Sequence, residues 1–249
     1  MASPTRILFI SGEVRPFADE SPLAELTRHL SEDLQDVSGL DARLMMPCYG
    51  GINERTNRLH EVIRLSGTEV PMGDDVETLT VKVASLPDTR MQVYFMDHDA
   101  YFDRDGVSAN EDGEAFDDNS RRALFFDRAV LETLRTLRWR PDVIHAFGWI
   151  SGLVPALLKT EYPSDEVLGG IPVVYTPDTV AANAIVPESV NDDGSLEAGT
   201  SLAAAGRQYA DTVIHLPGAD EGTVFPEARD EQADFVLDAY AALSSEVPA

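Results

Sequence analysis

Short apolar runs recur along the chain at intervals that leave room for a helix between successive runs. Several of them are apolar throughout instead of alternating with polar residues, which is typical of parallel strands covered on both faces. The predicted strands are Arg6–Ser11, Ala42–Met46, Leu79–Ala84, Met91–Met96, Asp142–His145, Pro172–Thr176 and Thr212–Leu216.

Amphipathic stretches lie between these runs and predict helices. The first begins at Pro22, a residue favoured in a first helical turn, and carries Leu23, Leu26, Leu30 and Leu34 on one stripe. The other predicted helices are 120–138, 149–159, 198–209 and 232–243, while 59–96 reads as a hairpin or insertion and 97–119 and 187–199 read as polar loops.

The order of these elements predicts an α/β fold. We expect residues 1–249 to form a single Rossmann-like domain with a doubly wound, mainly parallel sheet, because this length suits one such domain. Ligands of such sheets bind beyond the carboxyl ends of the strands.

Acidic residues outnumber basic residues by 44 to 19, which gives a net charge of −25 and a pI near 4.3. Such a surface repels phosphate backbones and anionic lipids, so we expect no nucleic-acid and no membrane partner. No apolar run reaches the ~20 residues of a membrane span, and we expect a cytoplasmic chain. An acid-rich, lysine-poor composition also suits a salt-rich cytoplasm, where salt screens self-repulsion.

The sequence predicts no metal site and no cofactor. The five histidines are dispersed and Cys48 is the only cysteine, so no zinc pattern and no internal disulfide arises. The acidic loop 103–113 faintly resembles a calcium loop, but neither glycine register supplies the first-position Asp and twelfth-position Glu. We therefore expect a solvated loop.

The turn Ser11–Leu23 follows the first predicted strand. It lacks the glycine pattern of a dinucleotide-binding loop, and no Walker A motif occurs in the chain. Asp19 and Glu20 place negative charge where an anion would sit, which argues against a phosphate site. The alternative is an acidic loop that favours the dipole of the following helix.

Two further segments follow predicted strands at the same edge of the sheet. In the first, His145-Ala-Phe-Gly-Trp149, the histidine is either a functional donor or base, or a core residue with Trp149 as packing. In the second, Pro47-Cys-Tyr-Gly-Gly-Ile-Asn53, Tyr49 either stacks on a sugar ring or packs in the core.

Several segments together resemble the amino-terminal half of bacterial glycogen and starch synthases. They are Ile7–Ala18, Pro47-Cys-Tyr-Gly50, Pro141-Asp-Val-Ile-His-Ala-Phe-Gly-Trp149, Val173–Thr176 and Tyr209–Val213. The resemblance implies the first domain of a GT-B glycosyltransferase, and the family's reaction moves glucose from ADP-glucose to an α-1,4-glucan with retention. The family's nucleotide-sugar site lies largely on a second, carboxyl-terminal domain, which we do not expect within these 249 residues.

The chain departs from the family's motifs at the donor site. The family's Lys-Thr-Gly-Gly-Leu phosphate loop aligns with Asp19-Glu20-Ser21-Pro22-Leu23, so the lysine and both glycines are replaced. The family's active-site histidine and the aspartate after it are Phe147 and Gly148 here. The resemblance implies sugar or acceptor contacts at Glu13, Tyr49, His145 and Trp149. It implies a degenerate donor-phosphate loop made of Asp19, Glu20, Ser21 and Pro22. It assigns no catalytic residue.

Three functions stay open at this point. The first is a glycogen or starch synthase that is impaired or inactive as an isolated chain and needs a partner to supply the donor domain. The second is a non-catalytic glucan-binding or regulatory subunit, and the third is a structural subunit without a ligand. The expected ligand is an α-glucan or maltooligosaccharide, and ADP-glucose is not expected to bind to this chain alone.

Overall fold

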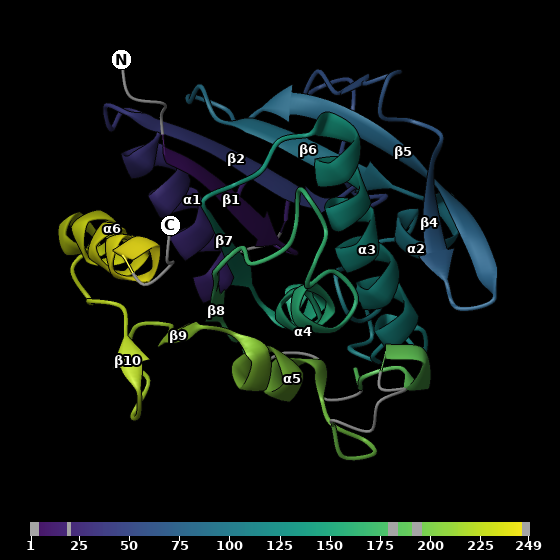
Figure 1. The fold of residues 1–249 in the computed structure, drawn as a ribbon. Coiled ribbons are helices and arrows are strands. Elements are labelled where there is room, and N and C mark those ends of the chain that lie inside the picture. Colours follow the sequence, from purple (N-terminus) through teal and green to yellow (C-terminus); the bar gives the residue numbers. More distant parts are fainter. Residues whose placement is uncertain (1–4, 19–20, 179–183, 191–195, 246–249) are drawn as a thin grey trace.

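A mainly parallel sheet runs through the centre of the molecule (Figure 1). The computed structural model describes residues 5–18, 21–178, 184–190 and 196–245. Among these residues the parallel strands are, in order across the sheet, β10 (Thr223–Val224), β9 (Thr212–His215), β8 (Val173–Thr176), β7 (Val143–Phe147), β1 (Thr5–Ser11), β2 (Leu40–Pro47) and β6 (Gln92–Asp97). The predicted α/β fold is confirmed.

An antiparallel extension continues the sheet beyond β6. Strand β5 (Asp75–Ser85) pairs antiparallel with β6, and β3 (His60–Glu61) and β4 (Thr68–Met72) pair antiparallel with β5. Segment 59–96 therefore forms the predicted run of consecutive strands.

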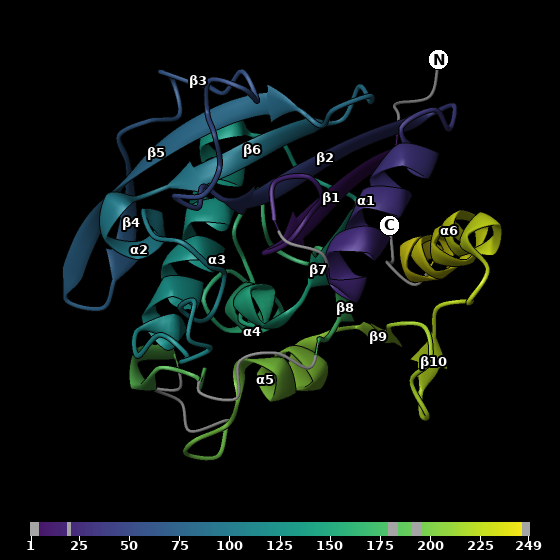
Figure 2. The same ribbon diagram turned by 180° about the vertical axis from the view of Figure 1, so that it is seen from behind.

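Helices cover both faces of the sheet (Figures 1 and 2). Helices α1 and α6 lie side by side on one face, and α3 and α4 lie on the other. The helices are α1 (Pro22–Leu34), α2 (Asp99–Phe102), α3 (Asn119–Leu137), α4 (Val154–Thr160), α5 (Leu202–Tyr209) and α6 (Arg229–Ser245), with 3-10 turns η1 (Trp149–Ser151) and η2 (Glu188–Val190).

The start of α1 follows from its first residues. The side-chain oxygen of Ser21 accepts a hydrogen bond from the backbone N–H of Ala24 at 3.0 Å, and Pro22 occupies the first turn. This arrangement satisfies one of the free donors at the helix start, and proline costs nothing there because its position needs no N–H. The predicted leucine stripe is buried against the sheet.

The helix predicted over 149–159 is wrong in its first half. A 3-10 turn at Trp149–Ser151 is followed by Gly152 and Leu153, and the α-helix begins only at Val154. Two features separate the pieces. A Cβ on Gly152 would lie 2.5 Å from the carbonyl oxygen of Leu202, so this backbone packs directly on α5, and Pro155 lies in the first turn of α4. Proline is tolerated there but not inside a continuous helix. Helix α5 likewise starts at Leu202, after Ser201 as its cap, and not at 198.

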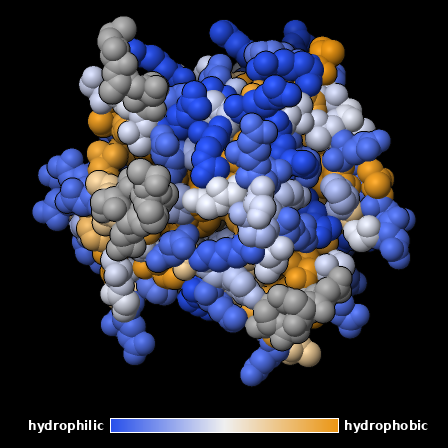
Figure 3. All heavy atoms as spheres, viewed as in Figure 1, coloured by the Kyte–Doolittle hydropathy of each residue, from blue (hydrophilic) through white to orange (hydrophobic). Residues whose placement is uncertain are grey.

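The core forms around the central strands. Ile7, Leu8, Phe9 and Ile10 of β1 are fully buried, as a strand covered on both faces requires. Outside the core, hydrophilic residues cover most of the face seen in Figure 3. None of the helices within the described residues has the length and hydrophobicity to cross a bilayer.

Candidate functional site

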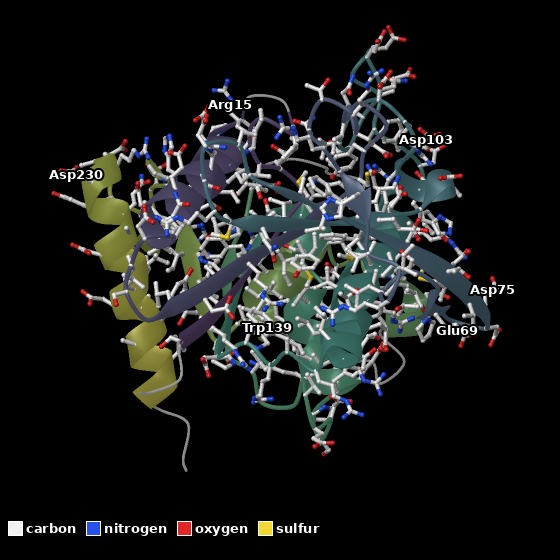
Figure 4. The ribbon with its side chains drawn as sticks, turned by 90° about the horizontal axis from the view of Figure 1, so that it is seen from above. Arg15, Glu69, Asp75, Asp103, Trp139 and Asp230 are labelled. Carbon is white, nitrogen blue, oxygen red and sulfur yellow. The ribbon has the colours of Figure 1, made fainter. Side chains whose placement is uncertain are left out.

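A cavity of about 610 Å³ opens where the turn after β1 and the loop after β2 approach the loop that follows α2. Figure 4 labels Arg15 on the turn after β1 and Asp103 directly after α2, where the third of these segments begins. The described lining residues are Glu13, Pro16, Phe17, Ala18, Ser21, Tyr49, Gly51 and 105–111. The cavity therefore lies at the carboxyl edge of the parallel strands, where sheets of this type bind ligands.

The turn between β1 and α1 is held by its own side chains. The Ser11 hydroxyl donates to the carbonyl oxygen of Glu13 at 2.7 Å and accepts from the Glu13 N–H at 3.1 Å. Ser21 donates to the Glu13 carboxylate and also caps α1. Glu13 is 8% exposed and faces the cavity.

These contacts bear on the degenerate phosphate loop. Ser21 already accepts the Ala24 N–H, and Pro22 has no N–H to offer, so this part of the helix start presents few donors to a phosphate. Asp19 and Glu20, the other two predicted loop residues, lie outside the described residues.

Tyr49 lies on the loop after β2 and lines the cavity. The residue is 5% exposed, its ring packs edge-on against Phe102 at 6.0 Å, and its hydroxyl has no hydrogen-bond partner within the described part of the chain. A Cβ on Gly12 would lie 3.4 Å from this hydroxyl, so the end of β1 packs closely on it. Burial raises the pKa of Tyr49, and its hydroxyl is therefore neutral.

His145 is a core residue, contrary to its implied role as a sugar contact. It is fully buried on β7, with Nδ1 at 2.7 Å from the Tyr240 hydroxyl and Nε2 at 2.8 Å from the Thr176 hydroxyl. Its ring stacks on Phe147 at 3.9 Å. Burial lowers the pKa of His145 well below its usual range, so the ring is neutral. A side chain with both nitrogens bonded and no exposed surface cannot contact a sugar.

Trp149 is also packed away from solvent. It is 2% exposed in the 3-10 turn after β7 and does not line the cavity. Of the four implied sugar contacts, the structure brings Glu13 and Tyr49 to the cavity and places His145 and Trp149 in the core.

The loop 105–111 supplies the other wall of the cavity, whereas its sequence predicts only a solvated loop. It is an ordered turn, because the Asn110 side chain accepts the N–H groups of Asp112 and Glu114 at 3.0 and 2.9 Å. Gly106 has φ +88°, and a Cβ on it would lie 2.2 Å from the Ala109 carbonyl oxygen. The Asn110 and Gly106 positions are the turn signals that could have revealed this structure.

The cavity wall is acidic. Its described lining includes the carboxylates of Glu13, Asp105 and Glu111, and no lysine or arginine. Two unit charges at 4 Å interact with about 4 kcal/mol at an effective dielectric constant of 20. A phosphate in this cavity would meet repulsion without a compensating cation, whereas a neutral polyol could donate its hydroxyl protons to the carboxylates. Within the described residues, no cluster of histidine, cysteine and carboxylate side chains has the grouping a metal ion needs.

Residues 6–216 match the family model described as the starch synthase catalytic domain. The glycogen synthase of Chlorobium limicola is 41% identical over 186 residues, which make up 74% of this chain and 38% of that protein. The glycogen synthase of Chlorobium phaeobacteroides is 35% identical over 237 residues, covering 86% of this chain and 48% of that protein. The chain thus spans less than half the length of these curated relatives.

A solved structure shows the same fold. The catalytic domain of starch synthase IV from Arabidopsis thaliana, bound to ADP and acarbose, superposes with a TM-score of 0.69 at 17% identity and covers 96% of this chain and 50% of that one. The resemblance to glycogen and starch synthases drawn from the sequence motifs is confirmed.

Proposed function

Because this chain belongs to the starch synthase catalytic-domain family, we propose that it binds a neutral α-1,4-glucan in the cavity beside Tyr49 and does not transfer glucose from ADP-glucose by itself. One observation carries the proposal: the described cavity wall holds three carboxylates and no cation. The role we infer is in glycogen metabolism, on the acceptor side of the family's reaction.

The cavity has the chemistry that a glucan needs. Phe17, Pro16 and Tyr49 contribute apolar surface for the faces of sugar rings. The carboxylates on the wall contribute acceptors for sugar hydroxyls. Its volume of about 610 Å³ is within the usual range for small-molecule sites, roughly 300–1,000 Å³.

The same wall disfavours the nucleotide sugar. The diphosphate of ADP-glucose carries negative charge, and Glu13, Asp105 and Glu111 repel it. Ser21 and Pro22 replace glycines that would present free N–H groups in the family's loop, and Ser21 is already used as a helix cap. Both features support the absence of autonomous transfer.

A second candidate is a complete synthase reaction in which a donor-binding half on a partner chain acts with this one. The observation that favours it is that the match covers only 38% and 48% of the two relatives. Under this candidate the chain supplies acceptor binding and the partner supplies nucleotide-sugar binding. A regulatory glucan-binding subunit uses the same cavity without a partner, whereas a structural subunit uses no ligand.

Calorimetry and an incorporation assay test the proposal. The purified chain, in high KCl, is titrated separately with maltoheptaose and with ADP-glucose, and incorporation of labelled glucose into maltoheptaose is followed in parallel. We expect binding of maltoheptaose, no saturable binding of ADP-glucose and no incorporation. Incorporation by the chain alone would refute the absence of transfer, and silence toward both ligands would favour a structural subunit.

A pair of charge-reversal variants tests the electrostatic argument. Glu111→Lys places a cation at the cavity wall, whereas Asp230→Lys makes the same charge change outside the described lining. Asp230 is labelled on α6 in Figure 4. At low salt we expect a phosphorylated maltooligosaccharide to bind more tightly to Glu111→Lys than to Asp230→Lys. Equal affinities in the two variants would show that the acidic wall does not select the ligand.

A further inference from the structure

The geometry points to Arg122 as a positioning residue for ligand binding. Its buried side chain holds the cavity wall 105–111 in place without lining the cavity itself. The inference rests on the proposed function, since it concerns the same cavity. Arg122 lies in the first turns of α3, is fully buried and is not among the lining residues.

The guanidinium of Arg122 connects three points of one loop. Its Nε donates to the Tyr101 carbonyl oxygen at 2.8 Å, and its Nη1 donates to the Val107 carbonyl oxygen at 2.8 Å and to the Asn119 side-chain oxygen at 2.7 Å. Tyr101 belongs to α2 at the start of the loop, Val107 is part of the cavity wall, and Asn119 ends the loop. One side chain therefore holds both ends and the middle.

Neighbouring contacts act on the same wall. The Asn119 amide donates to the Ser108 carbonyl oxygen at 2.8 Å, so two adjacent wall residues have their carbonyl groups held by the first turn of α3. The rings of Phe102 and Phe116 lie under the guanidinium, with centroids at 5.6 and 5.0 Å from its central carbon. The aromatic contacts and the carbonyls leave the guanidinium little freedom to move.

The charge of Arg122 has no carboxylate partner at ion-pair distance within the described residues. Burying a charge without an opposite charge is costly, and its Nη2 has no hydrogen-bond acceptor among them either. A residue that only supported packing would do so more cheaply as an apolar side chain. The planar guanidinium explains why arginine occupies this position, because its donors reach three separated oxygens at once. A lysine ammonium is a compact point charge and cannot do so.

Arg121 provides the matched control. It is the preceding residue on α3, but it is partly exposed and contacts the Tyr101 hydroxyl and Glu77 on the β5 side, away from the cavity lining. Arg122→Lys and Arg121→Lys therefore make the same chemical change, but only Arg122 is hydrogen-bonded to the wall. Asn119→Ser is a milder second variant, which weakens the link to Ser108 and keeps the guanidinium.

The test combines maltoheptaose affinity with amide hydrogen exchange of the whole chain. We expect Arg122→Lys to weaken maltoheptaose binding about tenfold and to speed exchange within 103–118, because lysine cannot keep the hydrogen bond to the Val107 carbonyl together with those to the two ends of the loop. Arg121→Lys should change the affinity less than about twofold. Should Arg122→Lys fail to fold, Asn119→Ser is expected to show the same two effects at smaller size.

Each outcome decides the inference. Faster exchange in 103–118 with unchanged maltoheptaose affinity would overturn it, because the wall would then be loosened without consequence for the ligand. Equal losses of affinity in Arg122→Lys and Arg121→Lys would also overturn it. A wild-type chain that binds no maltoheptaose would refute the proposed function and, with it, a positioning role toward that ligand.

Discussion

Two buried polar side chains, one within β7 and one just after β2 on the other side of β1, have opposite environments. On β7, His145 has a hydrogen-bond partner for each ring nitrogen, a stacked aromatic ring and no exposed surface. After β2, Tyr49 has a hydroxyl without a partner in the described structure and borders a cavity of about 610 Å³.

We infer that the difference separates a structural group from a candidate ligand contact. A buried polar group with all its hydrogen bonds made stabilises a unique packing, whereas one left unpaired lowers stability. His145 is thus a core residue despite its place in a family motif, and Tyr49 remains a proposed ligand contact.

The largest expected effect comes from removing the His145 side chain. His145→Ala leaves a cavity and removes one hydrogen-bond partner each from Tyr240 and Thr176, so we expect the free energy of unfolding to fall by about 3–5 kcal/mol. Urea denaturation measures it, with His29→Ala on the partly exposed side of α1 as the control, for which the loss should stay below about 1 kcal/mol. A loss below 1 kcal/mol in His145→Ala would contradict a structural role.

Acid should lower the free energy of unfolding through the same histidine. Because burial lowers the pKa of His145 in the folded chain, the unfolded chain takes up a proton first as the pH falls below the usual pKa of about 6.5. The contribution of neutral His145 to the free energy of unfolding is complete above about pH 6.5. It decreases below that pH, by at most about 1.4 kcal/mol per pH unit. Denaturation curves between pH 7 and pH 5 should show this slope in the wild type and a smaller one in His145→Gln. Equal slopes would assign the acid sensitivity to other groups.

A pair of tyrosine substitutions should give smaller effects of opposite sign. Tyr240→Phe removes a hydroxyl bonded to His145 and should cost about 1 kcal/mol. Tyr49→Phe removes a hydroxyl without a partner and should leave the stability unchanged or raise it by up to about 1 kcal/mol. Thermal and urea unfolding of both variants measure the difference, and a destabilised Tyr49→Phe would show that the hydroxyl has an internal role.

The regular elements follow from local patterns in the sequence. The leucine stripe after Pro22 predicts α1, and the spacing of apolar residues predicts α3 to within one residue at either end. The break between Trp149 and Val154 was not predictable in the same way, because it depends on contact between Gly152 and Leu202, which are 50 residues apart.

The site was only partly predictable for the same reason. Glu13 and Tyr49 were placed at the right edge because they follow β1 and β2, and parallel strands bring their carboxyl ends together. The role of His145 was undecided because its partner Tyr240 is 95 residues away on α6. The wall 105–111 was missed because Arg122 and Asn119, on α3, hold its carbonyl groups.

Site-resolved amide hydrogen exchange with and without ligand tests the central claim most directly. Binding of a neutral glucan beside Tyr49 predicts that maltoheptaose slows exchange in 105–111 and in the turn 12–18, and that ADP-glucose at the same concentration slows neither. Protection of 11–23 by ADP-glucose, or protection by maltoheptaose only at residues away from the cavity, would contradict the account.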